Sequence, residues 1–123
     1  MATTKQEFVE DNLHGYKRVH WNWESDSTGA VSNQTEFSYD GMITDLTTKP
    51  GSGSDAPTTL YDVYINDENG IDLLNGQGVD RSATLQEHKG KVDGLGTALH
   101  SKLTLVVANA GDITKGQCRI DLR

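Results

Sequence analysis

Apolar and polar residues alternate along several short segments of this chain. Val19, Trp21 and Trp23 are separated by polar residues, and Cys118 and Ile120 follow the same rule near the other end of the sequence. A period of two places neighbouring side chains on opposite faces of a β-strand, so such a segment predicts a strand with one face toward a core. The predicted strands are residues 19–24, 31–39, 42–49, 58–66, 102–109 and 117–123.

Turn signals between these segments predict how the strands connect. Asp40-Gly41 is a strong hairpin signal between two predicted strands. Residues 102–109 and 117–123, joined by the loop AGDITKG, predict a closing hairpin. Short strands joined by turns, without a convincing long helix, predict an all-β fold: a compact antiparallel β-sandwich or barrel with an N-terminal arm.

Two regions depart from the simple alternation. Residues 58–66 carry apolar side chains on both faces, because Leu60 and Tyr64 lie opposite the other apolar residues. This pattern predicts a central strand or an interface strand. Residues 75–97 are rich in glycine and weakly periodic. We expect an irregular excursion there, with a short strand or one turn of helix around residues 83–87.

The first fifteen residues are predicted to form the arm, and residues 16–123 a single β-domain. Thr4 and Glu7 have the spacing of a capping box, which signals a helix start. So short a helix is marginal in water on its own, so we expect the arm to order against a partner, or else to fray. The candidate partner-binding residues of the arm are Phe8, Val9 and Leu13.

Composition narrows the range of partners. The chain has 34% hydrophobic residues and a formal net charge of −7. The small apolar content predicts a thin core that assembly with other chains would support. The acidic charge repels phosphate backbones, so we expect no nucleic-acid partner. We expect no membrane partner either, because no apolar run approaches the length of a membrane span, and the N-terminus has no apolar segment typical of a secretion signal.

The residues that could carry chemistry are scattered. The four histidines show no metal-ligand spacing, and Cys118 lies on a predicted inward face without an identifiable base. We therefore expect no enzyme activity, no catalytic residues and no cofactor or metal. The candidate histidines are His14, His20, His88 and His100.

Two features allow more than one interpretation. The turn from Asp67 to Asp72 has the order D-x-N-G-x-D, which suits calcium, although a polar hairpin turn explains the same residues and is favoured. Trp21 and Trp23 share one face of a strand, so they form either part of the core, which we favour, or an aromatic platform for a ligand.

Two segments carry a family resemblance. The segment YDVYINDENGIDLLNGQGVDRS, from Tyr61 to Ser82, resembles small virion structural proteins encoded by tailed bacteriophages. The closing segment LTLVVANAGDITKGQCRIDLR resembles the terminal hairpin of the same group, and with Tyr39-Asp40-Gly41 the likeness covers roughly residues 37–123. The resemblance implies a compact β-domain present in many copies on the particle.

The acidic charge favours the outer surface of that particle over the inner wall that faces packaged DNA. The expected function is that of a capsid decoration (cement) protein, which binds the major capsid protein and stabilises its lattice. The resemblance also implies self-association as a homotrimer. The alternatives are a head–tail neck, head-closure or tail structural protein and, from another class, a carbohydrate-binding module.

Overall fold

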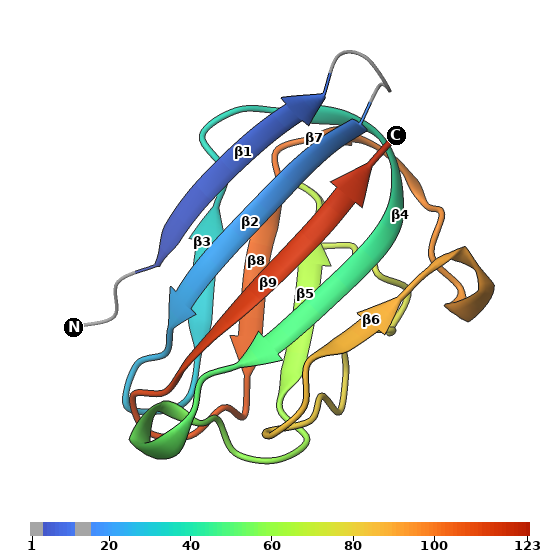
Figure 1. The fold of residues 1–123 in the computed structure, drawn as a ribbon. Helices are drawn as coiled ribbons and strands as arrows, with labels where there is room; N and C mark the ends of the chain where they lie inside the picture. The colour runs from blue at the N-terminus through green and yellow to red at the C-terminus, as the bar shows by residue number, and fades with distance from the viewer. Residues whose placement is uncertain (1–3, 12–15) are drawn as a thin grey trace.

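The chain folds into two antiparallel β-sheets that lie one behind the other (Figure 1). The computed structural model describes residues 4–11 and 16–123, with the backbone alone for residues 7–11. The predicted all-β fold is confirmed: the larger sheet curls into a half-barrel, and the second sheet packs against it. The strands are β1 (Lys5–Asp11), β2 (Tyr16–Glu24), β3 (Val31–Gln34), β4 (Tyr39–Pro50), β5 (Asp62–Asn66), β6 (Glu87–Lys89), β7 (Ala98–Ser101), β8 (Thr104–Ala108) and β9 (Lys115–Leu122).

Strand β9 lies at the centre of the larger sheet, whose order is β1-β2-β9-β4-β6, with β7 paired to the first part of β4. In register, Trp21 of β2 lies opposite Cys118 of β9, and Thr48 of β4 lies opposite the same cysteine on the other side. The central strand is therefore held by main-chain hydrogen bonds on both edges over most of its length.

The smaller sheet has the order β3-β8-β5. Its strand β5 is bordered by the irregular segment that follows, because the Val63 N–H donates to the Gly78 carbonyl at 2.8 Å. The prediction of a central strand is therefore wrong: β5 lies at the edge of its sheet, and Leu60 is 57% exposed. The irregular excursion expected at residues 75–97 is confirmed, and it contains the short strand β6 and one 3₁₀ helix, η2 (Lys91–Asp93). A second 3₁₀ helix, η1 (Gly53–Asp55), lies between β4 and β5. None of the described helices is long and apolar enough to cross a membrane.

The core fills the space between the sheets and includes both tryptophans. Trp21 and Trp23 are almost fully buried, so their interpretation as an exposed ligand platform is wrong. The ring of Trp23 lies 5.7 Å from that of Tyr61, at a tilted angle of 53°. Glycine at position 116 makes room for this ring, because a Cβ there would lie 2.4 Å from Trp23 Cζ2. The inward faces predicted for β2 and β9 are confirmed by burial.

Residues 5–11 form a strand, so the helix start predicted at Thr4 and Glu7 is wrong. Strand β1 pairs antiparallel with β2 over its whole length, from Lys5 opposite Asn22 to Asp11 opposite Tyr16. The boundary predicted between arm and domain falls between these two paired strands. Long-range main-chain pairing overrides a local capping signal, because a short helix has little stability of its own.

The hairpin predicted at Asp40-Gly41 is also wrong. Strand β4 runs straight through both residues, pairing first with β7 and then with β9. Gly41 has a φ of +126°, and a Cβ there would lie 2.8 Å from the Arg123 carbonyl oxygen. The glycine therefore serves a close approach of two backbones where β4 changes partner, and not a reversal of the chain. Strand β3 pairs instead with β8, in the other sheet.

The predicted closing hairpin is wrong as well. Strands β8 and β9 form at the predicted places but belong to different sheets. The connection between them crosses from one sheet to the other. The Ser25 hydroxyl donates a hydrogen bond to the Gly111 carbonyl oxygen of this connection at 3.1 Å. Alternation predicts which side chains face inward, but it does not select the partner of a strand.

Candidate functional site

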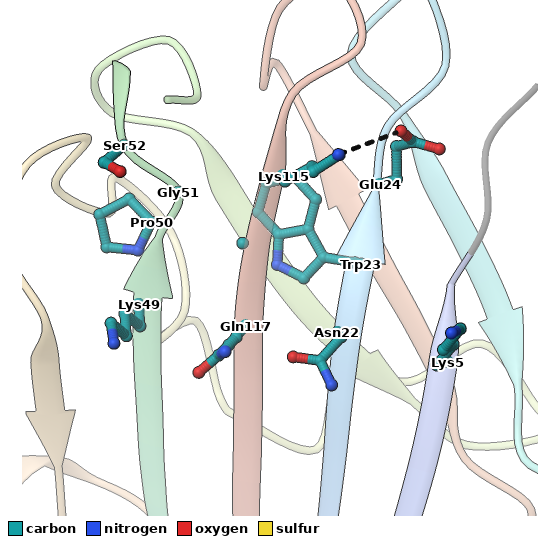
Figure 2. Close-up of a pocket in the computed structure, with 11 residues that line it drawn as sticks. Lys5, Asn22, Trp23, Glu24, Lys49, Pro50, Gly51, Ser52, Lys115 and Gln117 are labelled. Carbon is teal, nitrogen blue, oxygen red and sulfur yellow. Dashed lines mark ion pairs between the residues drawn. The ribbon is translucent and has the colours of Figure 1, made fainter. Parts of the chain in front are cut away.

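A shallow basic cleft lies on the outer face of the larger sheet, near the end where β4 and β2 finish and β9 begins (Figure 2). It consists of three neighbouring hollows of about 470, 370 and 120 Å³, and Lys49 lines all three. We call this surface the basic cleft. The polar and charged residues that line it on the three main strands and β1 are Lys5, His20, Asn22, Glu24, Thr47, Lys49, Lys115, Gln117 and Arg119.

One row of side chains crosses four strands of the cleft. Lys49 lies opposite Gln117, Gln117 opposite Asn22, and Asn22 opposite Lys5. Figure 2 shows these four side chains side by side on β4, β9, β2 and β1. Directly opposite residues of antiparallel strands have Cβ atoms about 4.5–5.5 Å apart, so the row presents two amides between two ammonium groups.

A second row lies two residues further along the strands. Arg119 of β9 is opposite His20 of β2 on one side and Thr47 of β4 on the other. The Arg119 Nη2 donates to Thr47 Oγ1 at 3.4 Å, and Arg119 Nε is buried with no acceptor among the described residues. His20 Nε2 lies 3.4 Å from Asn22 Oδ1. The guanidinium is therefore held in place but incompletely hydrogen-bonded.

The charge of the cleft is opposite to that of the whole chain. Four of the chain's eleven lysines and arginines line the three hollows, against one of its eighteen carboxylates. That carboxylate is Glu24, whose Oε1 lies 3.9 Å from Lys115 Nζ. Basic side chains gathered on an acidic protein create a local positive potential that attracts anionic groups.

At the other end of the same face, basic side chains lie beside carboxylates. Arg18 Nε lies 2.8 Å from Asp121 Oδ1, and that hydrogen bond raises the pKa of the arginine. His88 Nε2 lies 3.0 Å from Asp45 Oδ1. The arginine at this end is already paired with a carboxylate, so the part of this face suited to binding an anionic group is the basic cleft.

The candidate partner-binding residues predicted for the arm fall outside what the structure describes. The backbone of Phe8 and Val9 lies in β1, opposite Val19 and Arg18, but their side chains are not among the described ones, and Leu13 lies outside the described residues. Their binding role stays a prediction. None of the described residues that line the basic cleft belongs to this predicted set. Lys5 of the cleft lies on the same strand, β1, as the backbone of Phe8 and Val9.

The turn from Asp67 to Asp72 uses its carboxylates for backbone hydrogen bonds. Asp67 Oδ1 accepts the Asn69 and Ile71 N–H groups at 2.8 and 3.0 Å. Asp72 accepts from Leu74 and Gly76, both at 3.0 Å. Within the described ranges, no three His, Cys, Asp or Glu side chains gather so as to hold a metal ion. The polar-turn interpretation is the one that this geometry supports.

The remaining candidate residues that the structure describes lie at separate sites. Cys118 is buried, and burial raises the pKa of its thiol to about 12. His20 lines the basic cleft, His88 pairs with Asp45, and His100 is exposed. His14 lies outside the described residues. Among the described residues, a protonated buried thiol and histidines at separate sites do not form a nucleophile and its base.

Sequence reasoning missed the basic cleft because its residues come from five separate segments of the chain. The available signal was the polar face of each predicted strand: Lys115, Gln117 and Arg119 alternate with buried residues and point outward together. Comparison with protein-family models, with curated proteins and with solved structures finds no match to this chain.

Proposed function

We propose that this chain is a structural protein of a tailed-bacteriophage virion, a capsid decoration (cement) protein that binds the outer surface of the major capsid lattice. Its role is binding, without catalysis and without a cofactor. The placement on a virion rests on the resemblance of Tyr61–Ser82 and of the closing segment to small virion structural proteins. Self-association as a homotrimer belongs to the same proposal.

The observation that carries the docking role is the basic cleft on an otherwise acidic domain. The net charge of −7 keeps such a protein away from packaged DNA and soluble between lattice sites. The cleft supplies one surface of opposite sign, built on three hydrogen-bonded strands that need no rearrangement before binding. Charge complementarity at such a surface orients a partner and raises its association rate.

Copy number per virion is the most direct test. We expect quantitative mass spectrometry of purified particles to find several hundred copies, as symmetric decoration of a shell requires. About a dozen copies would place the chain in a neck or head-closure ring. Absence from the particle would contradict both the decoration role and the neck role.

The carbohydrate-binding alternative loses its main support, because Trp21 and Trp23 are buried.

A docking experiment locates the binding surface. Capsids without the protein are mixed with Lys49→Glu or with Lys91→Glu, and bound protein is measured by sedimentation. Lys49 lies in the cleft, whereas Lys91 is exposed on η2, outside the residues that line it. We expect Lys49→Glu to weaken binding at least tenfold, about 1.4 kcal/mol, and Lys91→Glu to have little effect. Equal effects of both variants would show that net charge, and not the cleft, controls docking.

A further inference from the structure

The smallest hollow of the basic cleft has a composition that selects one chemical class of ligand. Its volume is about 120 Å³, which is room for about four water molecules or for one small polyatomic ion. Every lining side chain can donate a hydrogen bond, and none is a carboxylate. The lining residues are His20, Thr47, Lys49, Gln86, Gln117 and Arg119. We call it the Arg119 pocket.

Arg119 contributes to this pocket a charged group with a buried donor atom. Its single described hydrogen bond is long, at 3.4 Å to Thr47 Oγ1, and its buried Nε has no acceptor among the described residues. Among the described residues, no carboxylate lies within 4.0 Å of Arg119 or Lys49. A buried cationic donor without an acceptor costs free energy, and an anion that accepts from the guanidinium recovers part of it.

Arg18 shows what the same sheet does elsewhere with an arginine. It lies on the outer face of β2, where register places it opposite Asp121 of β9, and the two side chains form an ion pair of 2.8 Å. Arg119 has histidine and threonine at the corresponding positions on its two neighbours. The sheet therefore supplies an internal carboxylate to one arginine and leaves the other to an external acceptor.

The pocket is also preorganised. Arg119, His20 and Thr47 form one cross-strand row, and Lys49 lies opposite Gln117 in the next. In register, Glu7 of β1 lies opposite His20 of β2, and His20 lies opposite Arg119 of β9. Strand β2 therefore separates this acidic residue from Arg119. Donors fixed on adjacent strands line one hollow without the ordering of a loop, so little conformational entropy is lost on binding.

We propose that the Arg119 pocket binds an oxyanion group, the shared chemistry of carboxylate, sulfate and phosphate. The guanidinium and the Lys49 ammonium supply the charge, and the Thr47 hydroxyl and the Gln117 amide supply neutral donors. A long polyanion is disfavoured, because it would extend beyond the cleft into the acidic remainder of the domain. This site exists in the free protein and does not depend on the proposed virion function.

The test uses the purified protein and three probes: sodium sulfate, sodium phosphate and sodium acetate. Each is titrated at constant ionic strength against sodium chloride, and ¹⁵N–¹H spectra are recorded. We expect saturable shifts confined to the strand segments around His20, Thr47 and Arg119, with a Kd on the order of millimolar. The preference between acetate and the two tetrahedral ions distinguishes a carboxylate site from a sulfate or phosphate site.

Two variants make the test specific. Arg119→Gln should weaken binding at least tenfold, and Lys49→Gln should weaken it less, while the control Lys91→Gln leaves it unchanged. Lys49 is exposed, so its variant keeps the test valid even if Arg119→Gln does not fold. Absence of saturable shifts with all three probes would overturn the proposal. So would binding that both pocket variants retain, or tighter binding to a short DNA oligonucleotide than to phosphate through the same residues.

Discussion

The side chains on the two faces of strand β9 make different kinds of interaction. On the inner face, Cys118 and Ile120 are fully buried against the core. On the outer face, Arg119 and Asp121 are half-buried and differ in their partners: Asp121 is paired with an arginine, whereas Arg119 has only a long hydrogen bond to a threonine. One alternating sequence therefore produces a tightly packed surface and a charged surface on the same backbone.

This difference separates stability from binding. Packing on the inner face fixes the sheet, and any loss of volume there is felt by the whole domain. Charges on the outer face lie near water, where pairing contributes little to folding. The outer face can consequently carry charged side chains for binding at a smaller cost in stability than the same charges would have in the core. Substitutions on the inner face of β9 should therefore lower the free energy of unfolding much more than substitutions on its outer face.

The largest effect is expected from truncating the inner face. Ile120→Ala removes buried methyl groups between the two sheets. We expect the free energy of unfolding to fall by about 2–5 kcal/mol, because the cavity is only partly filled by relaxation. Gln117→Ala, on the outer face of the same strand, should stay within about 0.5 kcal/mol of the wild type. Urea unfolding followed by tryptophan fluorescence measures both, and equal losses would contradict the division between faces.

A smaller loss is expected from adding one methyl group to the inner face. In Gly116→Ala the new Cβ would lie 2.4 Å from Trp23 Cζ2, so the indole must move. We expect a loss of about 1–3 kcal/mol from overpacking, visible as a lower Tm. Gly90→Ala is the matched control, since its nearest contact would be an ordinary 3.8 Å. A Tm of Gly116→Ala equal to that of the control would show that Trp23 is not held by this contact.

The third effect appears only at alkaline pH. Burial raises the folded-state pKa of Cys118 from 9.0 to about 12. The stability contributed by the protonated thiol is present below the unfolded-state pKa and is lost as the pH rises from about 9 toward 12. The Tm of the wild type should therefore fall more steeply in this range than that of Cys118→Ala. Iodoacetamide should label the thiol only on unfolding, and rapid labelling of the native protein would place Cys118 at the surface.

The smallest effect is expected from the ion pair on the outer face. Asp121→Asn removes the partner of Arg18, whose side chain is 46% exposed. We expect a loss of about 0.2–1 kcal/mol at low salt, and less at high salt because of screening. Asp112→Asn, an exposed loop position, removes the same charge without that pair. If both variants lose the same stability at both salt concentrations, net charge and not pairing is responsible.

Alternation along the sequence predicts the strands and their buried faces well, because a period of two is a local property. It correctly assigned Trp21, Ile120 and the other inward residues of β2 and β9. It failed where a choice between distant partners was needed. The Asp40-Gly41 turn signal is real in isolation, but Gly41 serves a close approach to Arg123 that no local pattern reveals.

The basic cleft was beyond local prediction for a related reason. Each contributing segment is an ordinary polar strand face, and neither Lys49 nor Arg119 is unusual within its own segment. The cationic character arises only when β2, β9 and β4 lie side by side. A correct pairing of strands would have revealed it, since register alone aligns His20, Arg119 and Thr47 in one row.

The central position of β9 also governs how the domain acquires its fold. Its neighbours β2 and β4 lie far earlier in the sequence, so the entropy of closing long loops is lost before the central pairing forms. A growing chain on the ribosome would hold β2 and β4 as open, unpaired edges until β9 emerges, and open edges are prone to associate with other chains. We therefore expect folding on the scale of milliseconds to seconds, with the larger sheet completed in one late, cooperative step.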